Sequence, residues 1–279
     1  METVAVLGKN WRLFGAFFVT YSFISTIVLG VVNQTNYATL SAALKSNNTD
    51  LWLRTFTIFG SAITGGLNPT TSSDGQALGG LLVLLAWLTM VWLLRHVVNQ
   101  QTVTLREGLY NAGSPLISMA LVSVVGIMQC IPLILVAVGF SAATSTGLLA
   151  NGIEAMLFIG AAALLAALSL YWLTSTFIAL IVVTLPGVYP MAALRAAGDL
   201  VVGRRLRLIL RLLWMFLFVV LIWAIILIPI ILLDNWLSIA WLPLVPVSVL
   251  ALSTLTLILS STYIYLLYRK MVDDDAKPA

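Results

Sequence analysis

Residues that could do chemistry are scarce in this sequence of 279 residues, which contains one cysteine, Cys130, and one histidine, His96. A single cysteine forms no disulfide within the chain and no metal site with two thiolates. A single histidine excludes the His-Glu-x-x-His zinc motif, and no Walker A loop, dinucleotide fingerprint or nucleophile elbow is present. We therefore predict that the protein is not an enzyme and that it uses no metal or cofactor.

Polar residues within apolar segments are the next candidates, because ionisable groups inside a membrane usually have a function. Glu154 begins one apolar run and Asp234 ends another, so both are also compatible with solvated helix ends. Gln129 lies well inside a run, where its amide either hydrogen-bonds to a neighbouring helix or contacts a substrate.

The composition indicates which class of protein contains these candidate residues. Hydrophobic residues make up 61% of the chain and charged residues 9%, whereas a soluble domain carries about 25% charged residues. Intrinsic disorder is also excluded, because it requires low hydrophobicity. The remaining class is a polytopic membrane protein.

Six apolar runs approach or exceed the roughly 20 residues that a helix needs to cross a bilayer. They are continuous rather than alternating, which predicts helices and excludes a β-barrel. We expect an all-α fold with one membrane domain over residues 1–279, in which Pro132 and Pro229 kink the third and fifth spans. The spans are expected at about residues 13–32, 78–94, 116–140, 155–185, 212–233 and 242–268.

Basic residues are divided unequally between the two sides of this map. Twelve of the 14 Lys and Arg residues lie in the terminal tails and in the connections 95–114 and 186–211, and the exceptions are Lys45 and Arg54. The positive-inside rule then predicts a cell-membrane protein with both termini in the cytoplasm. Residues 33–77 form an outer loop, in which the apolar segment 51–59 is an interfacial helix or a re-entrant segment.

A cytoplasmic amphipathic segment is predicted over residues 189–205. Met191, Leu194, Gly198 and Val201 share one helical face, so the helix is expected to lie flat on the cytoplasmic leaflet. Its basic residues act as a positive-inside anchor, bind a lipid head group or phosphate, or dock a partner. The candidate binding residues are Arg195, Arg204, Arg205, Arg207 and Arg211.

Short, partly charged segments precede the odd-numbered spans. Residues 104–109 and 193–198 both contain a Leu-Arg pair at the same place, and Gly8, Gly113 and Gly203 begin the stretches that lead into the spans. We interpret the chain as three copies of one unit, an amphipathic helix followed by a helical hairpin. Each copy begins on the cytoplasmic side, so the repeat is parallel, as in some transporters.

Residues 190–205 resemble a segment of known bacterial membrane proteins. The chain reads Ala-Leu-Arg at 193–195, Leu-Val at 200–201 and Gly-Arg at 203–204, just before an apolar span. This is similar to a segment in the six-span membrane domain of glycerophosphoryl diester phosphodiesterases, although Ala197 stands where that pattern usually has Ser. In some members the domain is fused to a soluble catalytic barrel, for which this chain leaves no room, so the resemblance implies the membrane layout without the hydrolase activity.

Three functions remain open from the sequence. The first is a non-enzymatic scaffold or accessory protein that organises membrane lipids, including anionic head groups, or a protein partner. The second is a transporter or permease-like carrier of a neutral or lipophilic solute. The third, an enzyme acting on lipid, would depend on Glu154, Asp234 and the arginines alone. Nucleic acid is not expected as a partner, because the positive-inside distribution already explains the net charge of +4.

Overall fold

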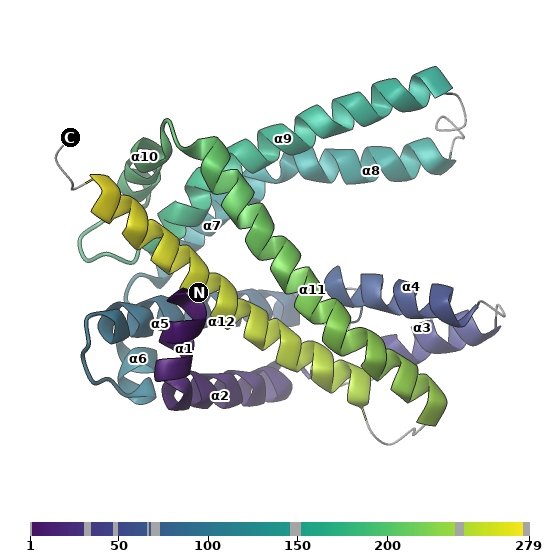
Figure 1. Ribbon diagram of the computed structural model, residues 1–279, viewed down its shortest axis with the longest axis horizontal. Coiled ribbons are helices and arrows are strands. Elements are labelled where there is room, and N and C mark those ends of the chain that lie inside the picture. Colours follow the sequence, from purple (N-terminus) through teal and green to yellow (C-terminus); the bar gives the residue numbers. More distant parts are fainter. Residues whose placement is uncertain are drawn as a thin grey trace. The chain divides into compact units, whose positions relative to one another are not determined.

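The computed structural model describes residues 2–30, 35–46, 50–65, 67, 73–145, 152–237 and 243–275. Within these ranges the regular structure is entirely helical (Figure 1). The helices are α1 (Glu2–Lys9), α2 (Trp11–Leu29), α3 (Thr35–Ser46), α4 (Leu51–Ile63), α5 (Ser73–Val98), α6 (Leu105–Asn111), α7 (Leu116–Gln129), α8 (Ile131–Ser145), α9 (Gly152–Val182), α10 (Pro190–Val201), α11 (Arg205–Leu237) and α12 (Leu244–Asp275).

Five of the described helices, α2, α5, α9, α11 and α12, are long and apolar enough to cross a membrane. The count rises to six if α6 and α7, which are bent by 76° at their junction, are taken as one span. The prediction of a helical, multi-pass membrane protein is therefore confirmed at this level. Pro229 lies inside α11, which continues through it as one helix.

The third predicted span, residues 116–140, is divided between α7 and α8. The first helix ends at Gln129 and the second begins at Ile131, with Cys130 between them. Pro132 explains the division, because proline has no N–H to donate and its ring clashes with the carbonyl four residues earlier. Proline is well tolerated in the first turn of a new helix, which is the position it occupies in α8.

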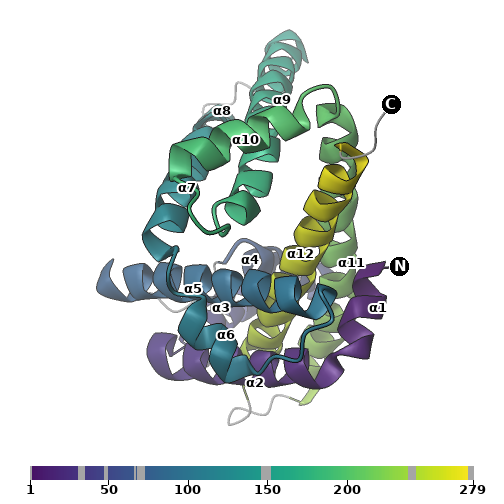
Figure 2. The same cartoon turned by 90° about the vertical axis from the view of Figure 1, so that its left-hand side faces the viewer.

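The chain forms two compact units, and α11 and α12 contribute to both of them. Unit 1 contains Met1–Gly113 and Trp214–Tyr263, and unit 2 contains Ser114–Leu213 and Ile264–Ala279. In unit 1, α2 packs against α5, and α6 contacts both helices (Figure 2). Thr104 begins α6 with a capping box: its side chain accepts a hydrogen bond from the Glu107 N–H, and the Glu107 carboxylate accepts one from the Thr104 N–H.

Residues 33–77 contain two helices, α3 and α4, which pack against each other. α4 buries Ile58 and Ala62 in a core cluster with Trp223 and Leu227 of α11, and Val249 of α12 belongs to the same cluster. The other side of α4 exposes large apolar side chains, namely Leu51, Trp52, Leu53 and Phe56. This segment, which is too short to span, therefore lies alongside two of the long helices.

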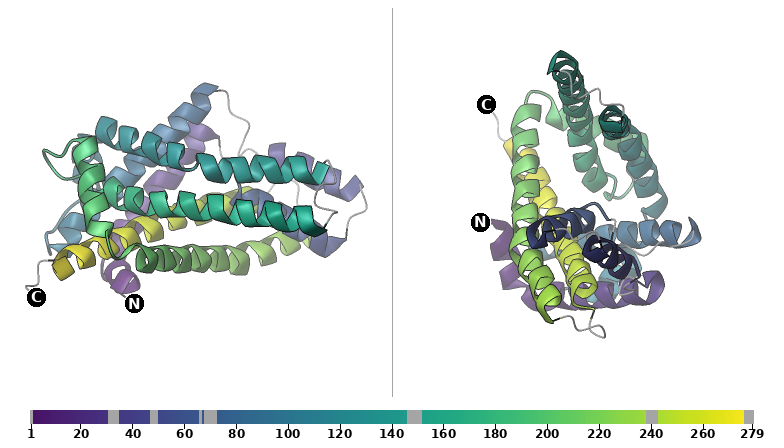
Figure 3. Two further views of the ribbon diagram at one scale, coloured as in Figure 1. Left: turned by 90° about the horizontal axis from the view of Figure 1, so that it is seen from above. Right: turned by 90° about the vertical axis from the view of Figure 1, so that its right-hand side faces the viewer.

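In unit 2, α8 and α9 lie side by side (Figures 1 and 3), and α7 also packs on α9. α10 lies across α7 and α9 (Figure 2). Its buried face consists of Ala193, Ala197 and Val201, each with 0% exposure. Small side chains at this spacing allow the helices to approach closely. Of the face predicted from the sequence, Val201 is buried but Met191 is exposed.

This packing predicts that enlarging Ala197 destabilises unit 2. Ala197→Leu inserts three carbon atoms into a closed interface, so the free energy of unfolding is expected to fall by about 1–3 kcal/mol. The neighbouring Ala196 is exposed, so Ala196→Leu makes a matched control. Thermal unfolding in detergent compares the stabilities of the two variants. Equal stability would contradict the packing of Ala197 in a closed helix interface.

Candidate functional site

A polar cluster in unit 1 joins α3, α4 and α11. The Tyr37 hydroxyl of α3 donates a hydrogen bond to the carboxylate of Asp234, near the end of α11. Arg54 of α4 is close enough for its charge to act on Tyr37. Asp234, a candidate from the sequence, therefore has a tyrosine partner that lies far from it along the chain.

The Tyr37 hydroxyl stays protonated over the physiological pH range. Burial raises the pKa of Tyr37 above its ordinary value of about 10, and the hydrogen bond to Asp234 and the charge of that carboxylate raise it further. The positive charge of Arg54 opposes these effects and lowers the pKa, but the net direction is upward. Tyr37 is thus a stable donor that ties α3 to α11.

A second polar cluster, in unit 2, lies at the break between α7 and α8. Thr176 of α9 donates from Oγ1 to Oε1 of Gln129, over 2.6 Å. Ser169, also in α9, donates from Oγ to the backbone oxygen of Gln129, over 2.7 Å. A Cβ at Gly126 would come within 3.3 Å of Thr176 Cγ2, so the two helices are in close contact. Gln129 therefore hydrogen-bonds to a neighbouring helix, one of the two uses expected from the sequence.

The five candidate arginines occupy different environments. The Arg205 guanidinium lies 4.3 Å from the ring centroid of Tyr171 in α9, which is a cation–π contact. Arg195 and Arg207 are exposed, and Arg204 and Arg211 are half-buried. Arg195 and Arg207 are therefore the arginines best placed to meet a ligand outside the unit.

The exposed arginines lie among exposed apolar side chains on residues 189–207, which we call the α10–α11 corner. The fractional exposures are 79% for Tyr189, 70% for Met191, 66% for Val202 and 73% for Leu206. α10 is held against α9 by its buried alanines, so these side chains project from a fixed helix. The corner thus presents basic and apolar groups together.

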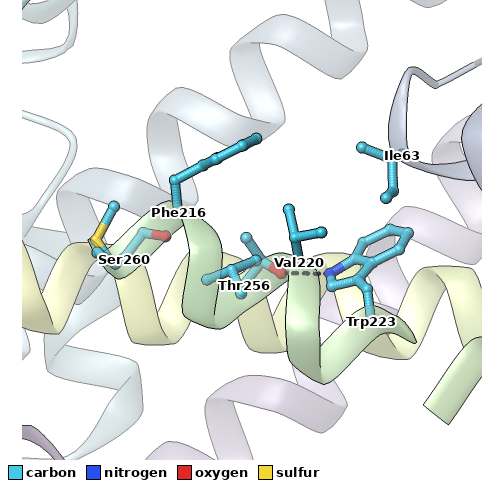
Figure 4. Close-up of a pocket in the computed structure, with 8 residues that line it drawn as sticks. Ile63, Phe216, Val220, Trp223, Thr256 and Ser260 are labelled. Atoms are coloured by element: carbon cyan, nitrogen blue, oxygen red, sulfur yellow. Dashed lines mark hydrogen bonds between the residues drawn. The ribbon is translucent and has the colours of Figure 1, made fainter. Parts of the chain in front are cut away.

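An apolar pocket of about 170 Å³ lies between α4, α11 and α12 in unit 1 (Figure 4). The indole Nε1 of Trp223 donates to Thr256 Oγ1 across one wall, over 2.9 Å. The residues that form the wall include Ile63, Phe216, Val220, Trp223, Thr256 and Ser260. Sequence patterns do not predict this pocket, because it requires knowing that α4 packs beside the middle of α11.

The remaining candidate, Glu154, lies in the first turn of α9 and is exposed. It belongs to unit 2, whereas Asp234 belongs to unit 1, so the structure places these two carboxylates in different units. Among the described residues, no group of three or more His, Cys, Asp or Glu side chains is arranged to hold a metal ion.

Sequence reasoning missed Tyr37 and Tyr171, the partners of Asp234 and Arg205. Tyr37 had one weak signal, a phenol near the expected outer end of a span, where amphipathic aromatic residues are common. Tyr171 lies within an apolar run, and nothing in the local sequence links it to Arg205.

Comparison of the chain with protein-family profiles, curated proteins and solved structures gives no match. The resemblance of residues 190–205 to the phosphodiesterase membrane domain therefore stays a prediction.

The Tyr37 contact predicts a pH-dependent contribution to stability. Tyr37→Phe removes a hydrogen bond to a carboxylate, so the free energy of unfolding at neutral pH is expected to fall by about 1–2 kcal/mol. Since the folded-state pKa is raised, the Tyr37 contribution is complete below pH 10 and declines as the pH rises above 10, where only the unfolded tyrosine ionises.

Thermal unfolding in detergent between pH 7 and pH 11 measures both effects. Tyr37→Phe is expected to show a shallower loss of stability at high pH than the wild type. Tyr189→Phe, at a 79% exposed position, is the control and should match the wild type. An identical stability and pH slope for Tyr37→Phe and the wild type would contradict the assignment.

Proposed function

We propose that the protein is a non-enzymatic, multi-pass protein of the cell membrane that acts as a scaffold or accessory protein and binds anionic lipid head groups. The observation that carries this proposal is the α10–α11 corner, where the exposed Arg195 and Arg207 accompany Tyr189, Met191 and Leu206. Apolar side chains of such a helix enter the boundary between head groups and acyl chains, while arginines meet the phosphates.

The fixed position of α10 supports a lipid-binding role. Its buried alanines pack on α9, so the backbone that carries its outer side chains is held in place before a ligand arrives. A preorganised site loses less conformational entropy on binding than a flexible basic tail. With both termini in the cytoplasm, as the distribution of basic residues predicts, the corner faces the inner leaflet, where anionic lipids are enriched.

The proposal includes the three-fold repeat expected from the sequence. A short helix precedes a longer apolar helix at α1, α6 and α10. Phe14, Met119 and Leu208 each occupy the fourth position of the helix that follows, and each is buried. In addition, α6 packs against α2 and α5, and α10 packs against α7 and α9, so α6 and α10 each contact helices of the preceding expected unit.

Replacing the exposed arginines is expected to weaken binding of anionic lipid. Each basic side chain near an anionic surface contributes about 1 kcal/mol, so Arg195→Gln combined with Arg207→Gln should lower the affinity about tenfold or more. The measurement is the ratio of phosphatidylglycerol to phosphatidylcholine that stays bound after purification from a defined mixture, determined by mass spectrometry.

Two controls accompany this measurement. Arg195→Lys combined with Arg207→Lys keeps both charges and should retain most of the enrichment. Lys45→Gln removes a charge from α3, on the predicted outer side, and should leave the enrichment unchanged. An undiminished enrichment in the double glutamine variant would contradict the proposed lipid-binding role.

A carrier of a neutral or lipophilic solute is the second candidate, and the break between α7 and α8 beside Gln129 favours it. Carriers commonly use discontinuous helices near their substrate sites. If residues near the break line a water-filled path, the native Cys130 should react with a water-soluble, membrane-impermeant thiosulfonate, and Cys130→Ser should abolish the labelling. The scaffold proposal predicts no labelling in native membranes.

A further inference from the structure

The pocket between α4, α11 and α12 lies halfway along two of the helices that can cross a membrane. Trp223 is near the middle of α11 (Arg205–Leu237), and Thr256 and Ser260 are near the middle of α12 (Leu244–Asp275). For spans of this length, the middle of the helix corresponds to the hydrocarbon layer. A ligand that enters the pocket from the side therefore comes from the acyl-chain region.

Two of the polar side chains in the wall, Trp223 and Thr256, hydrogen-bond to each other. Trp223 Nε1 donates to Thr256 Oγ1 over 2.9 Å (Figure 4), and Thr256 Oγ1 donates to the backbone oxygen of Leu252 over 2.8 Å. An indole has one N–H and a hydroxyl has one O–H, so both hydrogens are used within the protein. Neither of these two side chains offers a ligand a hydrogen-bond donor, so this part of the wall favours an apolar ligand.

The pocket has an exposed rim and a buried floor. Phe216 is 61% exposed and Ile63 is 37% exposed, whereas Trp223 is 9% exposed. Its volume of about 170 Å³ is close to that of an apolar cavity of about 150 Å³ that accepts benzene in another protein. It is smaller than the roughly 300–1,000 Å³ of pockets for drug-sized ligands, so it accommodates part of a lipid chain.

We propose that this pocket binds a segment of a membrane-lipid acyl chain, with Trp223 as its floor. The position halfway along α11 and α12, the mostly apolar wall in which Trp223 and Thr256 bond to each other, and the exposed rim all support this occupant. The site belongs to unit 1 and does not depend on head-group binding at the α10–α11 corner of unit 2. Either proposal can fail while the other holds.

Photolabelling of the full chain in bilayers tests the site directly. The probe is phosphatidylcholine with a diazirine at the middle of one acyl chain, and mass spectrometry locates the adducts. In the wild type we expect adducts on Trp223 and on Ile63, although Trp223 is nearly buried. Leu164 of α9 is 74% exposed and serves as an internal control for ordinary contact with lipid.

Two variants fill the pocket from opposite walls: Val220→Phe on α11 and Ser260→Met on α12. Each should lower labelling of Trp223 at least fivefold, while labelling of Leu164 stays constant. Leu217→Phe introduces the same phenyl ring at a 51% exposed position of α11 and should leave the Trp223 adduct intact. Absence of a Trp223 adduct in the wild type overturns the proposal, and so does an adduct that persists when the pocket is filled.

Discussion

Hydrocarbon provides no hydrogen-bond partner, so every backbone group that enters it must be satisfied within the protein. The break between α7 and α8 lies in the third predicted span, where this requirement would apply. Pro132 interrupts the regular helix, and the oxygen of Gln129 accepts a hydrogen bond from Ser169 of the neighbouring α9. The long helices follow the same rule with their hydroxyl groups, as Thr89, Thr174 and Thr262 each donate to the carbonyl four residues earlier.

The same constraint explains why polar side chains link helices in pairs. Ser22 and Thr254 hydrogen-bond between α2 and α12, over 3.2 Å, and Trp223 and Thr256 do so between α11 and α12. Apolar side chains gain little by leaving lipid for a helix interface, so hydrogen bonds and close contacts between small residues contribute more to association in a membrane. The buried alanines of α10 provide contacts of the second kind.

Apolar run length was sufficient to predict that the chain is helical and that several helices are long and apolar enough to cross a membrane, because bilayer thickness sets the length of a span directly. Pro132 is the local residue that indicates a break in the third apolar run. A proline can kink a helix or end it, and its packing neighbours decide which of the two happens. α11 continues through Pro229, whereas the helix before Pro132 ends. Local sequence does not distinguish these outcomes, because the hydroxyl that bonds to the backbone oxygen of Gln129 at the break belongs to Ser169 of α9.

The candidate site residues were only partly predictable for a similar reason. The candidate arginines could be identified from charge alone, but only the structure shows that Arg195 and Arg207 are the exposed ones. The partner of Asp234 is Tyr37, which precedes it by most of the chain, and only the packing of α3 against α11 brings them together. The pocket at Trp223 likewise depends on where α4 packs.

The proposed function depends most on the prediction that the α3–α4 region and the α10–α11 corner lie on opposite sides of the bilayer. Labelling of Lys45→Cys and Arg195→Cys, each in a Cys130→Ser background, with an impermeant maleimide on intact cells measures this directly. We predict that Lys45→Cys reacts in intact cells and that Arg195→Cys reacts only after the membrane is opened. Reaction of both positions under the same condition would contradict the account.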